Sequence, residues 1–61
     1  MYVTSSQVQY ISSLGRSAKL WNDGQLLDWL EFELDIKVPC LEMIDKADCT
    51  TIIHALQAKA A

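Results

Sequence analysis

Three helix starts recur in these 61 residues, at 3–8, 21–26 and 44–49. Each start places an apolar residue before a short capping residue, then two spacers, a polar or acidic residue and a second apolar residue. A capping side chain accepts a hydrogen bond from a first-turn amide that otherwise has no partner inside the helix. The three capping residues are Thr4, Asn22 and Asp45. Three such starts in so short a chain predict an all-α fold.

The residue three positions after each capping residue determines whether a second hydrogen bond completes the capping box. Gln7 and Gln25 can each accept a hydrogen bond from the cap, while the flanking apolar pair closes as a hydrophobic staple. At the third helix start, Asp48 is a weaker capping-box partner than glutamine, although its negative charge suits the positive end of a helix.

Apolar periodicity extends the three starts into helices of about 5–19, 23–34 and 46–59. Gly15 lies on the apolar arc of the first, so we expect it to continue the helix and let a neighbouring helix approach. The alternative is that Gly15 ends the helix as a C-terminal cap. The expected core stripes are Val8, Ile11, Leu14, Gly15 and Ala18, then Leu26, Leu27, Leu30 and Leu34, then Cys49, Ile52, Ile53 and Leu56.

Residues 35–44 are expected to form an irregular, partly extended connector. Pro39 disfavours a helical conformation at Val38, and Ile36 is β-branched. Together with Leu41, Ile36 and Val38 should cover the core. A chain of this length supports one domain, 1–61, so the sequence predicts a compact three-helix bundle.

The charge and composition of the chain exclude several classes of protein. A hydrophobic content of 51% argues against disorder. With a net charge of −3 and only five lysines and arginines, the chain cannot neutralise many phosphates, so direct nucleic-acid binding is not expected. No signal peptide or membrane span is visible, and two cysteines are too few for a secreted disulfide scaffold. We therefore expect a soluble cytoplasmic chain with reduced thiols.

The sequence contains no recognisable catalytic or metal-binding pattern. His54 is the only histidine, and the cysteines lack the close ligand pairs of a zinc site. Cys49 and His54 should point to different sides of their helix, which excludes a nucleophile and base pair. Glycine-rich phosphate loops are also missing. We expect neither enzymatic activity nor a cofactor nor a metal.

Four residues are candidates for partner binding. Trp29 and Phe32 lie off the core arc of their helix; they either cover the 35–44 connector or form a partner-facing apolar patch. Arg16 and Lys19, near the end of the first helix, either complement the helix dipole or form a basic lip beside an apolar groove that suits an acidic peptide.

The order of caps and leucines resembles that of a known family. The chain resembles the small C-terminal domains of phage single-strand annealing proteins of the lambda (Red beta) type. The similarity lies in segment 4–14, in the Trp21-Asn22-Asp23 turn followed by Leu26-Leu27, and in segment 41–61. The first turn is two or three residues longer here. The resemblance implies a three-helix docking module for a partner exonuclease and for the acidic tail of single-stranded DNA-binding protein. It carries over no individual contact residue.

The sequence thus favours a non-catalytic protein-docking module of phage-type single-strand annealing recombination. One alternative is a small helix-turn-helix-like regulator that binds nucleic acid. Its recognition helix would need several polar and basic residues on its exposed face, and the third helix offers only Lys46, His54, Gln57 and Lys59. A second alternative is a small phage inhibitor of a host enzyme. The oligomeric state is not readable from the sequence.

Overall fold

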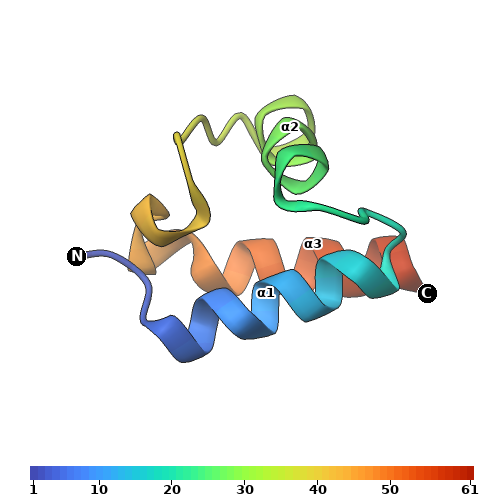
Figure 1. Ribbon diagram of the computed structural model, residues 1–61, viewed down its shortest axis with the longest axis horizontal. Helices are drawn as coiled ribbons and strands as arrows, with labels where there is room; N and C mark the ends of the chain where they lie inside the picture. The colour runs from blue at the N-terminus through green and yellow to red at the C-terminus, as the bar shows by residue number, and fades with distance from the viewer.

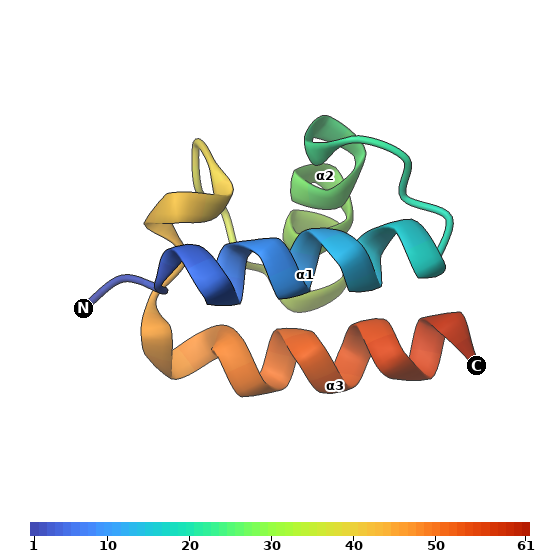
Figure 2. The same ribbon diagram turned by 60° about the horizontal axis from the view of Figure 1, so that its bottom comes forward.

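Helices α1 and α3 lie side by side and run in the same direction, and α2 crosses this pair at a large angle (Figures 1 and 2). The computed structural model describes all 61 residues, and the predicted all-α three-helix bundle is confirmed. The only β-type pairing is an isolated antiparallel bridge between Tyr2 and Asp45. The helices are α1 Ser5–Ser17, α2 Asp23–Leu34 and α3 Cys49–Ala60, with 3₁₀ turns η1 Leu41–Met43 and η2 Lys46–Asp48.

The first predicted helix start forms as a complete capping box. The Gln7 amide donates to Thr4 Oγ1 at 3.2 Å, and the Thr4 amide donates to Gln7 Oε1 at 2.7 Å. Val3 is buried and Val8 half-buried along the same hollow, as expected of a staple. The local sequence therefore accounts for the whole N-terminus of α1.

At the other two helix starts, the capping hydrogen bonds differ from the prediction. Asn22 caps α2 by accepting from the Gln25 amide at 2.8 Å, but Gln25 Oε1 accepts from the Trp21 amide at 2.6 Å and not from the cap. Asp45 accepts from the Ala47 amide at 2.9 Å, and the turn it caps is the 3₁₀ turn η2. The α-helix expected from 46 therefore begins at Cys49, because the first turn is wound more tightly.

The first helix ends at Ser17, two residues before the expected end at Lys19. Lys19 has a positive φ of 69°. Its amide donates to the Arg16 carbonyl at 3.0 Å, and the Leu20 amide donates to the Gly15 carbonyl at 2.8 Å, which is the pattern of a Schellman motif. This reversal turns the chain so that Leu20 packs back onto the core.

The core contains residues from every predicted stripe. Gly15 is inside α1, so its interpretation as a cap was wrong and its interpretation as a close-approach position is confirmed. Five residues of the predicted stripes lie at the edge of the core and are only partly buried: Val8, Leu14, Leu27, Leu34 and Ile53. The buried hydrophobic residues are Val3, Ile11, Ala18, Leu26, Leu30, Leu41, Ile44, Cys49, Ile52 and Leu56.

The connector and the N-terminal residues close one end of the bundle. Leu41 is buried and Ile36 and Val38 are half-buried against the core, as predicted, although the connector also contains η1. The Val3 amide donates to the Ile44 carbonyl at 3.0 Å, and the Lys46 amide donates to the Met1 carbonyl at 2.7 Å. These long-range hydrogen bonds attach the N-terminal segment between the connector and η2.

Candidate functional site

The C-terminal ends of α1 and α3 meet at one end of the molecule because the two helices are parallel (Figure 2). Arg16 lies in the last turn of α1, Lys19 follows it, and Lys59 lies in the last turn of α3; all three are exposed. Three of the five cationic side chains are thus carried by these two helix ends. The parallel arrangement brings Lys59 to the same end of the molecule as Arg16 and Lys19.

A shallow hollow of about 320 Å³ lies between these two helix ends. Lys19 and Lys59 provide its cationic groups, and the rest of its lining is small or hydroxylic. The lining residues are Ser17, Ala18, Lys19, Lys59, Ala60 and Ala61. The Lys19 and Lys59 ammonium groups in this lining can pair with a carboxylate.

A second hollow, of about 420 Å³, lies between α2 and α3. The half-buried Trp29 lines it on the α2 side and also packs against the core. Lys59 lines both hollows, so the basic end and the tryptophan hollow adjoin at this residue. The lining residues are Trp29, Glu33, Leu34, Ala55, Ala58 and Lys59. Together the two hollows, hereafter the basic-end groove, combine a mainly apolar part with a cationic part.

The two aromatic candidates have different environments. Trp29 packs against the core and lines the hollow between α2 and α3. Phe32 is 86% exposed, so it does not cover the 35–44 connector. Trp29 packs at the edge of the core although it lies outside the predicted core arc, whereas Phe32, which is one turn further along the helix and farther from that arc, is exposed.

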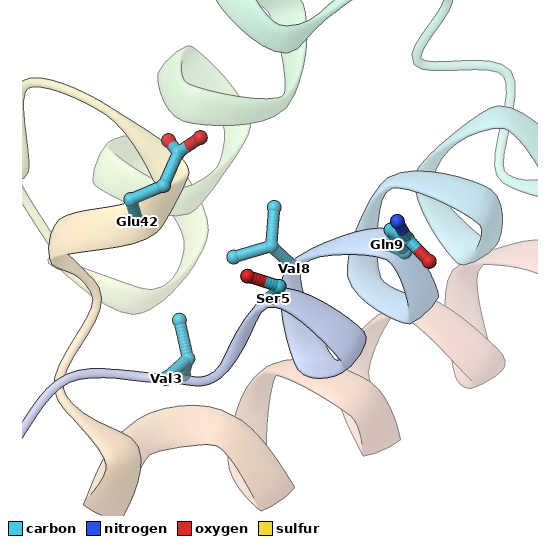
Figure 3. A pocket seen from close by; sticks show the side chains of 5 residues that line it. All are labelled: Val3, Ser5, Val8, Gln9 and Glu42. Carbon is cyan, nitrogen blue, oxygen red and sulfur yellow. The ribbon is translucent and has the colours of Figure 1, made fainter.

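A third hollow, of about 440 Å³, lies at the opposite end of the molecule, between the start of α1 and η1. Figure 3 shows the Val3 and Val8 side chains pointing to the same side, toward the turn that carries Glu42. Ser5 and Gln9 complete the lining. The staple and the cap of α1 explain this arrangement, and its mixed lining does not converge on a ligand.

The potentially reactive side chains do not assemble into a site. Cys49 is buried while His54 is exposed on the same helix, so the two point to different sides as predicted. Cys40 is half-buried, and both thiols are free. No three histidine, cysteine, aspartate or glutamate side chains come together in a way that could hold a metal ion. None of the helices has both the length and the hydropathy needed to cross a membrane.

Comparisons with protein-family models, with curated proteins and with solved structures gave no match to this chain.

Proposed function

We propose that this chain is a non-catalytic protein-docking module whose basic-end groove binds an acidic peptide tail of a partner. The observation that carries this proposal is the position of Lys59, which joins a cationic hollow to one walled by Trp29. A peptide with carboxylates next to an apolar residue matches both parts at once.

The charge balance at this end favours an anionic ligand. The C-terminus of each helix contributes about half a negative charge, so the ends of α1 and α3 together offset about one positive charge. The three exposed cations at this end, Arg16, Lys19 and Lys59, exceed that amount. Lys19 and Lys59 line the cationic hollow itself, while Glu33 lies in the tryptophan hollow. The Schellman hydrogen bonds already satisfy carbonyls at the end of α1, which leaves Lys19 free to pair with a ligand. The excess positive charge is available to carboxylates.

The tryptophan hollow supplies the apolar part of the interaction. Trp29 is anchored by its packing on the core, and a pre-positioned aromatic wall loses little freedom when a ligand binds. Ala55 and Ala58 leave space for an apolar side chain of the peptide. Glu33 at the edge of the hollow disfavours a carboxylate there, so the acidic part of the tail should lie toward Lys19 and Lys59.

The sequence resemblance supports the biological setting. Phage single-strand annealing proteins of the lambda type carry a small helical domain that docks an exonuclease and the acidic tail of single-stranded DNA-binding protein. A groove that selects an acidic tail fits this role, and the lack of a catalytic constellation is consistent with docking. We therefore propose protein docking in phage-type recombination as the setting of this function.

Titration followed by NMR tests this function with a short peptide of aspartates that ends in phenylalanine. The largest shifts should fall on Lys19, Trp29, Ala58 and Lys59, and the affinity should fall as salt rises. The double variant Lys19→Glu, Lys59→Glu should bind about tenfold or more weakly, whereas Lys46→Glu, at the other end, should bind like the parent.

Two further ligands complete the experiment. A peptide with asparagine in place of aspartate should lose most of the affinity, because it keeps the apolar end and removes the charge. Single-stranded and duplex DNA should not bind at physiological salt. DNA binding without peptide binding would reject the docking function in favour of a nucleic-acid-binding regulator.

A further inference from the structure

Phe32 is the most exposed large hydrophobic residue within the helices, with 86% of its surface open to solvent. It lies near the end of α2, on a helix that otherwise directs its large apolar residues toward the core or the basic-end groove. Leu26 and Leu30 are buried, and Trp29 packs against the core. Packing within the chain therefore does not explain why a phenylalanine is at this position.

Four carboxylates lie within four residues of Phe32 along the chain. Asp28 is one turn earlier on the same face, Glu31 and Glu33 flank it in sequence, and Asp35 follows the end of the helix. All four are exposed. We call these five residues the α2 acidic face. It is an exposed aromatic side chain in an anionic stretch of the chain, whereas the basic-end groove combines an aromatic wall with lysines.

Charge is strongly segregated along this chain. Residues 23–37 contain five carboxylates and one lysine, a formal charge of −4, while the remaining residues contain three carboxylates and four cations, a formal charge of +1. The only ion pair is Lys37 Nζ to Glu31 Oε1 at 4.0 Å, between two exposed side chains. Such a pair is screened by solvent and leaves most of the negative field of α2 in place.

We propose that the α2 acidic face is a second docking surface, for a protein partner that presents lysines or arginines around an apolar pocket that receives Phe32. Charge complementarity selects this occupant. An anionic nucleic acid or membrane surface is repelled by the four carboxylates, and like charge disfavours a symmetric dimer formed by two α2 acidic faces. Exposed aromatic residues with a polar rim are typical anchors of protein interfaces.

This proposal goes beyond the acidic-tail function and does not rest on it. The α2 acidic face and the basic-end groove share only Glu33, and their partners have opposite charge. Both surfaces can therefore be occupied together, which would let the module bring two proteins side by side.

The test uses an amphipathic helical peptide of lysine and leucine, titrated into the labelled protein and followed by NMR. Shifts should centre on Asp28, Glu31 and Phe32, and Phe32→Ala should weaken binding about tenfold or more. Tyr10→Ala is the matched control, because Tyr10 is a 48% exposed aromatic residue on α1; it should bind like the parent. Phe32 makes no core packing, so the Phe32→Ala variant should keep the parent spectrum outside α2.

A peptide with the same charge and with serine in place of leucine separates the contribution of Phe32 to binding from the attraction between opposite charges. It should bind more weakly than the leucine peptide and show no dependence on Phe32. Lys19→Gln, Lys59→Gln should leave Phe32-dependent binding of the lysine–leucine peptide in place, which distinguishes this surface from the basic-end groove. Equal affinity of the parent and Phe32→Ala, or shifts centred on Glu42, Asp45 and Asp48, would overturn the proposal. So would self-association of the protein that Phe32→Ala abolishes, since the occupant would then be a second copy.

Discussion

Gly15 of α1 lies against Leu26 of α2 so closely that a Cβ on Gly15 would be 3.3 Å from Leu26 Cδ2. Leu26 is buried, so its side chain has little room to retreat. A glycine inside a helix costs about 1 kcal/mol relative to alanine, and here the close approach of α2 accounts for its presence. This contact sets the distance at which α2 crosses α1.

Substitution of Gly15 should distinguish helix propensity from packing. Gly15→Ala should change the free energy of unfolding by less than about 1 kcal/mol, because the gain in propensity offsets the tight contact. Gly15→Val should destabilise by about 1–3 kcal/mol, since the added methyl groups force Leu26 to move. Ser13→Val, on the exposed side of the same helix, is the matched control and should cost less than about 1 kcal/mol. Urea unfolding measures all three, and equal effects of the two valines would contradict the packing role of Gly15.

Replacing Lys19 with glycine should stabilise the protein. Lys19 adopts a left-handed conformation with a φ of 69°, which costs a non-glycine residue about 1–2 kcal/mol. Lys19→Gly should recover about 1 kcal/mol, whereas Lys19→Ala keeps the strain and also loses the charge. The difference in unfolding free energy between the two variants isolates the backbone contribution. If alanine and glycine are equally stable, the Schellman geometry at the end of α1 is not what determines this position.

Removal of the first cap should destabilise α1. Thr4→Ala deletes the acceptor for the Gln7 amide and should cost about 1 kcal/mol. Gln7→Ala removes the reciprocal bond to the Thr4 amide and should cost less, because that exposed amide can bind water instead. Thr51→Ala, at an exposed threonine of α3, controls for loss of the side chain alone. Thermal unfolding followed by circular dichroism provides the comparison, and a Thr4→Ala midpoint equal to that of Thr51→Ala would refute the cap.

The two cysteines should differ in both reactivity and stability effects. Cys49 is buried within the core, whereas Cys40 is half-buried in the connector. A thiol reagent should therefore modify Cys40 first, with Cys49 reacting only when the protein opens. Cys49→Ser places a hydroxyl among apolar side chains and should cost about 1–3 kcal/mol, while Cys40→Ser should cost much less. Equal rates of modification for the native thiols would show that Cys49 is not held in the core.

The candidate site was predictable only in part. Arg16 and Lys19 are close in sequence, so helical geometry alone places both at the end of α1. Lys59 joins them only because α3 runs parallel to α1, and that direction depends on the path of the connector. Trp29 and Phe32 both lie outside the predicted core arc of α2, but Trp29 packs at the edge of the core and lines the hollow beside α3, while Phe32 stays exposed.

The sequence by itself determined the structural features that depend on residues close together along the chain. The caps at Thr4, Asn22 and Asp45 and the apolar stripes of three helices follow from hydrogen bonds and periodicity within one or two turns. The tertiary structure decided the features that depend on contacts between residues far apart in the sequence. The pairing of residues 1–3 with 44–46, the contact of Gly15 with Leu26 and the separation of a basic end from an acidic α2 each require an arrangement of helices in space. That arrangement is selected by burial of one shared core, a property of the whole chain that no single segment contains.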